Sequence, residues 1–167
     1  IFDVNFWGVR HGSQEAVEAM KKNGGVLINV GSEVSARSIP VQGMYSATKH
    51  AMKAYTEALR MEIDEEGWPI FVSLVRPTAI NTPYAEHAKN LLEEGEPSLP
   101  SPMYHPNVVA EAIVRCAESP QRDVYVGGAS RFSEIMETFA PRFLDLFMEK
   151  LMIGQQKLFA AKRATIQ

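Results

Sequence analysis

Apolar residues recur at two different spacings along this 167-residue chain, and the spacing predicts which segments are helices. Side chains repeated every three or four positions indicate one buried helix face. Glycine, proline and asparagine mark the ends of these segments, as at Asn23-Gly24-Gly25 and at Gly67. The helices predicted in this way span residues 1–22, 44–66, 81–92, 107–118 and 131–153.

Three short apolar runs separate these helices and predict strands at residues 26–30, 70–75 and 123–126. The runs are apolar on both faces and rich in β-branched residues, which is typical of parallel strands covered on both sides. Strands that alternate with long helices indicate a parallel α/β sheet. Three strands are too few for a stable open sheet of this type, so we expect further strands upstream of Ile1.

Two helices have faces with a distinctive composition. The helix at 44–66 carries small residues that we expect to face inward: Ala47, Ala51, Ala54 and Ala58. The segment 131–153 carries an apolar stripe from Phe132 to Leu151, which Pro141 should kink or divide. The stripe fits a core helix, a subunit contact, a lid over an apolar substrate or a membrane-surface helix. We expect it to be core or a subunit contact.

Composition excludes several classes of protein. The hydrophobic content of 46% and charged content of 22% are those of an ordinary globular protein. The net charge of -3 supplies no basic field for nucleic acid. No run reaches the roughly 18 apolar residues of a transmembrane segment. The single cysteine, Cys116, permits no intrachain disulfide and fits a cytoplasmic location, and the four histidines lack metal-ligand spacing, so no metal is expected.

Polar residues follow the first two predicted strands directly. Ser32 comes after the first strand, the segment from Thr78 to Thr82 comes after the second, and Tyr45 opens the helix at 44–66. Ligands of open parallel sheets bind beyond the carboxyl ends of the strands. The sequence therefore predicts that these residues converge at one rim of the sheet.

The pair Tyr45 and Lys49 lies one helical turn apart, so both side chains share one helix face. A nearby ammonium favours the phenolate and lowers the pKa of a tyrosine, which is otherwise about 10. Tyr45 could then act as a general acid or base on a carbonyl or hydroxyl oxygen, with Ser32 donating a hydrogen bond to that oxygen. A tyrosine and a lysine four residues apart are common, and so is a serine in a turn. Their combination, with the serine after a strand and the pair in the following helix, is much more specific.

Four motifs in order give the chain a family resemblance: V-N-F-W-G at 4–8, I-N-V-G-S at 28–32, Y-S-A-T-K at 45–49 and R-P-T-A-I-N-T at 76–82. From residue 1 to about 128 the chain resembles the C-terminal part of the short-chain dehydrogenase/reductase (SDR) family. The resemblance implies a Rossmann-like doubly wound parallel sheet whose N-terminal half, with the Gly-rich cofactor loop, is missing from this chain. Residues 1–130 would be the C-terminal half of that domain and residues 131–167 an amphipathic helical extension.

The resemblance also implies a role for each matching residue. Asn5 would hold a water that relays protons toward Lys49, and Ser32 would polarise the substrate oxygen. Tyr45 would be the acid/base, while Lys49 would bind the nicotinamide ribose and lower the Tyr45 pKa. The residues implied to line an NADP or NAD cofactor, besides Tyr45 and Lys49, are Pro77, Ile80 and Thr82. Where the family often has Pro-Gly, this chain has Pro77-Thr78.

The implied activity is NAD(P)(H)-dependent interconversion of an alcohol and a ketone or aldehyde, in a dimer or tetramer built through the helices of Asn5 and Tyr45. The substrate would be a small alcohol or carbonyl compound, and the stripe at 131–153 is compatible with an apolar one. The alternative is a non-catalytic fragment or interaction module that retains the motif but cannot bind cofactor. A hydrolase is disfavoured because Val34 replaces the second glycine of G-x-S-x-G. Gly127-Gly128 lacks the third glycine of a dinucleotide-binding loop.

Overall fold

The computed structural model describes residues 1–40, 42–83 and 102–150 of the chain. The predicted helix at 81–92 lies largely outside these ranges, and residues 81–83 are not helical. The described elements are η1 (Asp3–Gly8), α1 (Val9–Met20), β1 (Gly25–Val30), η2 (Glu33–Ser35), α2 (Gly43–Glu65), β2 (Ile70–Pro77), α4 (Pro106–Glu118), β3 (Asp123–Val126), α5 (Gly128–Phe139) and α6 (Pro141–Met148).

The three strands form one parallel sheet in the order β1-β2-β3. Gly25 pairs with Ile70 at one end of β1 and Val30 with Val75 at the other, while Val126 pairs with Pro77. All three predicted strands are confirmed, and so is their parallel arrangement. Two residues were missed at the end of β2, where pairing with β3 carries the strand on to Pro77.

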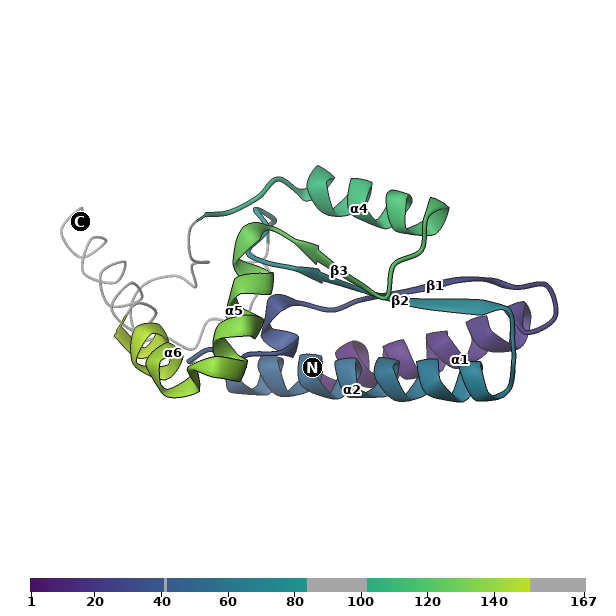
Figure 1. Cartoon of the computed structure of the whole chain (residues 1–167), viewed down its shortest axis with the longest axis horizontal. Coiled ribbons are helices and arrows are strands. Elements are labelled where there is room, and N and C mark those ends of the chain that lie inside the picture. Colours follow the sequence, from purple (N-terminus) through teal and green to yellow (C-terminus); the bar gives the residue numbers. More distant parts are fainter. Residues whose placement is uncertain (41, 84–101, 151–167) are drawn as a thin grey trace.

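Helices cover both faces of this sheet (Figure 1). The parallel pair α1 and α2 lies along one face, and α4 lies on the opposite face. Helix α5 leaves the end of β3 and crosses the carboxyl ends of the strands toward the start of α2, with α6 beyond it. The rim that follows the strands is therefore bordered by the start of α2 on one side and by α5 on the other.

The main core lies between α1, α2 and the sheet. Its buried apolar residues are Val17, Leu27, Leu59, Ile63, Ile70 and Val72. Burial of each such side chain contributes about 1.5–3 kcal/mol. Asn29 on β1 is buried in the same layer, where it accepts a hydrogen bond from Ser13 at 3.3 Å and donates one to Thr56 at 3.1 Å. This polar chain ties both helices to one point on the strand.

The alanines of α2 do not form its inward face. Ala47 and Ala54 are exposed, whereas Met52, Leu59 and Ile63 are buried against the sheet. The prediction that these alanines face inward is wrong for Ala47 and Ala54. Burial of the larger side chains removes more apolar area from water, at about 25 cal/mol per Å², and this decides which face of the helix meets the sheet.

Of the two long predicted helices, one is continuous and one is divided. The helix predicted at 1–22 is confirmed: the π-helix η1 continues directly into α1, since Gly8 and Val9 keep the helical conformation. The segment predicted at 131–153 begins earlier, at Gly128, and is divided at Pro141 as expected, because Ala140 leaves the helical conformation with φ -145° and ψ 56°. Five residues of its apolar stripe are exposed in the single chain, so for them the core interpretation is wrong, whereas the subunit contact stays a prediction: Ile135, Phe139, Phe143, Leu146 and Phe147.

Membrane-spanning helices and metal-binding clusters are both absent from the described residues. None of their helices combines the length and apolar character needed to cross a bilayer. Within the same ranges, no three His, Cys, Asp or Glu side chains come together in a way that could hold a metal ion. Cys116 is buried at 2% exposure on α4, as expected of a small core residue.

Candidate active site

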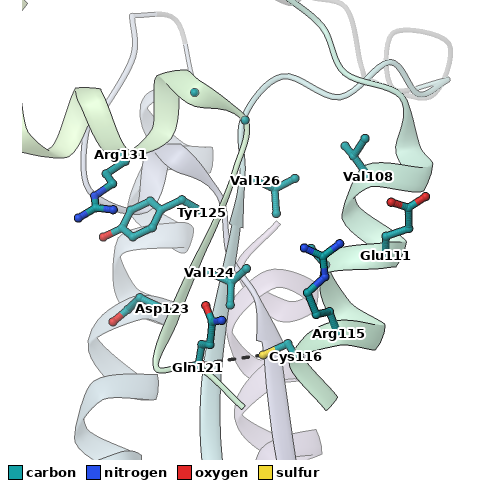
Figure 2. Close-up of a pocket in the computed structure, with 13 residues that line it drawn as sticks. Val108, Glu111, Arg115, Cys116, Gln121, Asp123, Val124, Tyr125, Val126 and Arg131 are labelled. Atoms are coloured by element: carbon teal, nitrogen blue, oxygen red, sulfur yellow. Dashed lines mark hydrogen bonds between the residues drawn. The ribbon is translucent and has the colours of Figure 1, made fainter. Parts of the chain in front are cut away.

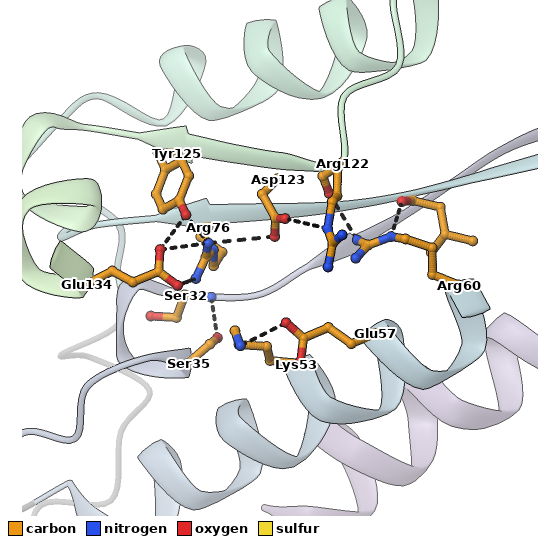
Figure 3. A network of polar contacts seen from close by, with 11 residues as sticks. Ser32, Ser35, Lys53, Glu57, Arg60, Arg76, Arg122, Asp123, Tyr125 and Glu134 are labelled. Carbon is orange, nitrogen blue, oxygen red and sulfur yellow. Dashed lines mark hydrogen bonds and ion pairs between the residues drawn. The ribbon is translucent and has the colours of Figure 1, made fainter. Parts of the chain in front are cut away.

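Ser32 lies just past the carboxyl end of β1, where the chain turns into η2. It caps η2 in extended conformation, and its hydroxyl oxygen accepts a hydrogen bond from the Val34 amide at 3.3 Å. The Ser35 hydroxyl accepts one in return from the Ser32 amide at 3.1 Å (Figure 3). The local sequence fixes the Ser32 side chain as an acceptor, so its O–H can donate to a substrate oxygen.

Tyr45 and Lys49 lie in the first turns of α2, and the Lys49 ammonium stands 5.9 Å from the centre of the Tyr45 ring. Lys49 Nζ donates a hydrogen bond to the carbonyl oxygen of Val30, the last residue of β1, at 3.2 Å. Burial lowers the pKa of Lys49 below its ordinary value. The contact joins the start of α2 to the end of β1, so Lys49 and Tyr45 share the rim on which Ser32 lies.

Asn5 lies in the π-helical turn η1 and contacts the same helix from the other side. Its side-chain amide donates a hydrogen bond to the Thr48 hydroxyl at 3.3 Å, and Thr48 is the residue before Lys49. A single π-helical turn is rare and is found frequently at functional sites. The structure therefore places Asn5 beside the Tyr45–Lys49 turn, through Thr48.

The predicted cofactor residues follow β2, one strand away from Ser32. Pro77 ends that strand, Ile80 forms an isolated bridge with Tyr104, and Thr82 is exposed. The Asn81 amide donates to the Tyr104 carbonyl at 2.9 Å, and the Tyr104 amide donates to Ala79 at 3.0 Å. Tyr104 therefore pairs with residues 79–81 and holds them as a short strand-like edge. The sequence analysis did not predict this role for Tyr104.

Thr78 occupies the position where the family often has glycine. Its amide donates to the Val126 carbonyl at 3.0 Å, and its side chain is buried against Gly127. Gly127 has φ +96° and ψ 146°, a conformation that is essentially restricted to glycine. The side chain of Thr78 therefore fits because Gly127, which it packs against, has no side chain.

A buried ion cluster supports the end of β2. Arg76 is 2% exposed and donates to both carboxylate oxygens of Glu134 on α5, at 2.9 and 3.0 Å (Figure 3). Its guanidinium also stacks 4.3 Å from the centre of the Tyr125 ring, and the Tyr125 hydroxyl donates to Glu134. Asp123 completes the cluster at 3.6 Å from Arg76. These contacts join β2, β3 and α5 immediately before Pro77.

The same contacts shift the pKa values of the cluster. Burial, reinforced by the hydrogen bond to Glu134, raises the pKa of Tyr125 to about 12. Burial alone would raise the pKa of Glu134, but hydrogen bonds from Arg76 and Tyr125 outweigh it and hold that pKa below its ordinary value. The cluster therefore stays ionised as a bidentate arginine–carboxylate pair beside a neutral phenol, and it supports the site without titrating near neutrality.

Two cavities lined by described residues lie near these elements, and one of them borders the loop that follows Ser32. A cavity of about 550 Å³ lies between residues 36–40 and α6, with His50 and Arg37 in its wall. A larger one of about 880 Å³ lies between α4 and β3, where Arg115 and Cys116 point from one wall (Figure 2). Neither cavity is lined by Ser32, Tyr45 or Lys49. We therefore place the candidate site from the contacts of these residues, at the rim between β1, β2 and α2.

Sequence reasoning missed Arg76, Glu33, Arg37 and Tyr104. Burial raises the pKa of Glu33, the residue after Ser32, to about 7. Arg37 forms ion pairs with Glu137 on α5 and with Asp145 on α6, although its side chain is only 13% exposed. Arg76 stood within the R-P-T-A-I-N-T motif, and a charged residue at the end of an apolar strand was a usable signal of a buried partner. The partners of Arg37 and Tyr104 lie too far away in sequence to predict, and no local pattern signals the burial of Glu33.

Comparisons with known proteins identify the family of the chain. Residues 1–92 match the family model described as short chain dehydrogenase. The chain is 40% identical over 158 residues to the oxidoreductase YxnA of Bacillus subtilis, covering 93% of this chain and 44% of that protein. It thus spans about half the length, or less, of the first curated relatives it matches.

Solved structures share the fold. A short chain dehydrogenase from Burkholderia cenocepacia in complex with NADP superimposes with a TM-score of 0.71 at 24% identity, over 88% of this chain and 56% of that one. A short chain dehydrogenase/reductase from Burkholderia phymatum in complex with NAD gives 0.70 at 22% identity, over 83% and 56%. The Rossmann-like fold class is confirmed, and only part of that fold is covered. With the family match over residues 1–92, these likenesses show that the chain belongs to the short-chain dehydrogenase family of oxidoreductases.

Proposed function

We propose that this chain carries the proton-transfer machinery of an NAD(P)(H)-dependent oxidoreductase that interconverts an alcohol and a ketone or aldehyde. The observation that carries the proposal is the position of Lys49, whose ammonium contacts the Val30 carbonyl and stands 5.9 Å from the centre of the Tyr45 ring. A cation at that distance favours the phenolate, so Tyr45 can exchange a proton with a substrate oxygen near neutral pH.

Each residue of the rim has one task in this proposal. Ser32 donates its O–H to the substrate oxygen and stabilises negative charge there. Tyr45 donates the proton to that oxygen in carbonyl reduction and accepts it in alcohol oxidation. Lys49 lowers the Tyr45 pKa. Asn5, held against Thr48, lies where it could order a water on the path by which the proton returns to solvent.

The residues also fit a nicotinamide cofactor, NAD or NADP. The Lys49 ammonium has three N–H groups and the described residues take one of them, through Val30, so the others suit ribose hydroxyls. Pro77, Ile80 and Thr82 form a short polar and apolar edge along the same rim, at the carboxyl end of β2. When bound, the nicotinamide supplies or accepts the hydride at the substrate carbon.

Substitution of the phenol tests the acid/base role. Tyr45→Phe, in the longest natural form of the protein, should reduce turnover of alcohol or carbonyl substrates by about 10²–10⁴-fold while cofactor affinity stays nearly unchanged. Tyr55→Phe is the matched control on the same helix, because its hydroxyl makes only a 3.4 Å contact with the Arg10 carbonyl. A Tyr45→Phe variant that keeps most of its rate would show that another group transfers the proton.

The alternative is a non-catalytic module that keeps the motif without binding cofactor. A ligand at 100 times its dissociation constant stabilises the folded state by about 2.7 kcal/mol. Thermal unfolding of the longest natural form with NAD(H) and with NADP(H) therefore separates the two functions. Stabilisation by either cofactor supports the enzyme, and no shift with both supports the module. Size-exclusion chromatography with light scattering tests the proposed homo-oligomer.

A further inference from the structure

Tyr104 lies just before α4, yet its backbone pairs with the residues that follow β2. The Tyr104 amide donates to the Ala79 carbonyl at 3.0 Å, and the Asn81 amide donates to the Tyr104 carbonyl at 2.9 Å. These two hydrogen bonds form the parallel bridge between Ile80 and Tyr104. Because they lie on either side of Ile80, the backbone of Tyr104 sets the position of Ile80 at the rim.

The bridge directs the backbone groups of Ile80 toward its other side. In a parallel pairing, the residue between two bonded neighbours turns its own N–H and C=O away from the partner. Among the described residues, none makes a backbone hydrogen bond to either of these two groups. Ile80 is half-buried, so both groups require a partner. The pairing with Tyr104 therefore leaves one donor and one acceptor of Ile80 for a ligand at the rim.

The side chain of Tyr104 contacts a second element, the turn from β3 into α5. Its hydroxyl oxygen accepts a hydrogen bond from the Gly128 amide at 3.2 Å. Gly128 is the first residue of α5, where backbone amides have no partner within the helix. The ring lies so close to the turn that a Cβ atom on Gly127 would be 2.9 Å from Tyr104 Cε2. The phenol is thus held by the start of α5.

Helix α5 is itself fixed to the sheet, so the phenol of Tyr104 contacts a well-supported element. Glu134 of α5 accepts hydrogen bonds from Arg76 of β2 at 2.9 and 3.0 Å (Figure 3). The backbone of Tyr104 holds Ile80, and its side chain is held by α5. We propose that Tyr104 is a positioning residue for the cofactor: it sets the place of Ile80, and with it the nicotinamide end of NAD or NADP, without touching the cofactor itself.

This inference rests on the proposed function, because it assumes that NAD or NADP binds along residues 77–82. It predicts an effect that is confined to one end of the cofactor. ADP-ribose has both riboses and the diphosphate but no nicotinamide ring. The proposed ribose contact of Lys49 does not involve Tyr104. Loss of Tyr104 should therefore weaken the binding of the whole cofactor and leave the binding of ADP-ribose nearly unchanged.

Calorimetric titration of the longest natural form of the protein tests this difference. Tyr104→Ala removes the ring and its hydroxyl and should weaken binding of the preferred cofactor by about tenfold, the scale of one or two misplaced hydrogen bonds. Affinity for ADP-ribose, or for its 2′-phosphate if NADP is preferred, should change by less than about twofold. Tyr104→Phe keeps the ring and loses only the bond to Gly128, so it should recover most of the affinity. Tyr55→Phe is the control, because Tyr55 lies on α2 and contacts the Arg10 carbonyl.

Hydrogen exchange without cofactor tests the positioning itself. The Asn81 amide, which donates to Tyr104, should exchange at least about threefold faster in Tyr104→Ala than in the wild type. The Gly31 amide is the internal control, because it donates to Val75 at 2.7 Å at the same rim and makes no contact with Tyr104. Its exchange should be unchanged in the variant.

Three results would overturn the role of Tyr104. The first is a Tyr104→Ala variant that keeps the wild-type affinity for the whole cofactor. The second is an equal loss of affinity for the cofactor and for ADP-ribose, which would show a general structural effect. The third is unchanged exchange at Asn81. A wild type that binds neither ligand would instead refute the proposed function, and exchange at Asn81 would then decide alone whether Tyr104 holds the edge.

Discussion

The contact between Gly127 and Thr78 gives a sharp test of how the end of β2 is built. Gly127 joins β3 to α5 with φ +96°, where a side chain is strained whatever space surrounds it. A Cβ atom at this position would overlap Thr78 Oγ1 and lie 2.9 Å from Tyr104 Cε2 and 3.1 Å from Thr78 Cγ2. Gly127→Ala therefore introduces a backbone penalty and a steric penalty at the same point.

The two penalties can be estimated separately. Holding a non-glycine residue in this conformation costs about 1–3 kcal/mol. Forcing a methyl group into a packed site costs about 1–3 kcal/mol more, because the neighbouring backbone and side chains must shift. We expect Gly127→Ala to lower the free energy of unfolding by about 2–6 kcal/mol in total. Thr78→Ala in the same chain should recover the steric part, which arises largely at Thr78, and leave the backbone part.

Urea denaturation of the wild type, the two single variants and the double variant measures this coupling. Gly12→Ala is the control, because Gly12 lies in α1 and a Cβ there would have no neighbour within 4 Å. That change should be neutral or stabilising by up to about 1 kcal/mol. A loss below about 0.5 kcal/mol for Gly127→Ala, within the range of ordinary surface changes, would refute the reasoning.

Three further predictions concern single residues. Lys49→Ala should reduce both turnover and cofactor affinity, measured by steady-state kinetics and titration; unchanged affinity would contradict a ribose contact. Glu33 has a raised folded-state pKa of about 7, so the folded protein keeps a proton that the unfolded chain releases above pH 4.5. The free energy of unfolding should then fall as pH rises from about 4.5 to 7, by at most about 3 kcal/mol, and Glu33→Gln should remove that slope in denaturation curves. Asn29→Ala removes the acceptor of the buried Ser13 hydroxyl and the donor to Thr56, whose own hydroxyl still donates to the Met52 carbonyl, and should cost about 1–3 kcal/mol in urea; a near-neutral result would show that water replaces the amide.

The elements predicted from the sequence are those whose signal is local. All three strands were predicted because each is a short β-branched run, and α4 begins within a residue of its expected start. The face of α2 was mispredicted because small residues say only that a close approach is possible. Which face approaches the sheet depends on Met52 and Ile63, and their burial is decided by the strands opposite them.

The apolar stripe of α5 and α6 illustrates a different limit. Periodicity showed that one face is apolar, but not that this face points outward. Its direction depends on Arg37 and Arg76, which bind the acidic face from distant parts of the chain. No local pattern contains that information, since the ion pairs form between segments 58 to 108 residues apart.

In the candidate site, too, some residues are fixed by local contacts and others by distant parts of the chain. Ser32 and Lys49 are fixed by contacts within the segment that carries their motifs: the η2 cap and the bond from Lys49 to Val30. The edge after β2 is fixed from outside its motif, by Tyr104, Gly127 and Glu134. A chain could therefore keep every motif residue and still lose the cofactor edge through a change at one of these three. For this reason the motifs alone predict the chemistry of Tyr45 better than they predict whether Pro77, Ile80 and Thr82 are correctly placed to hold a cofactor.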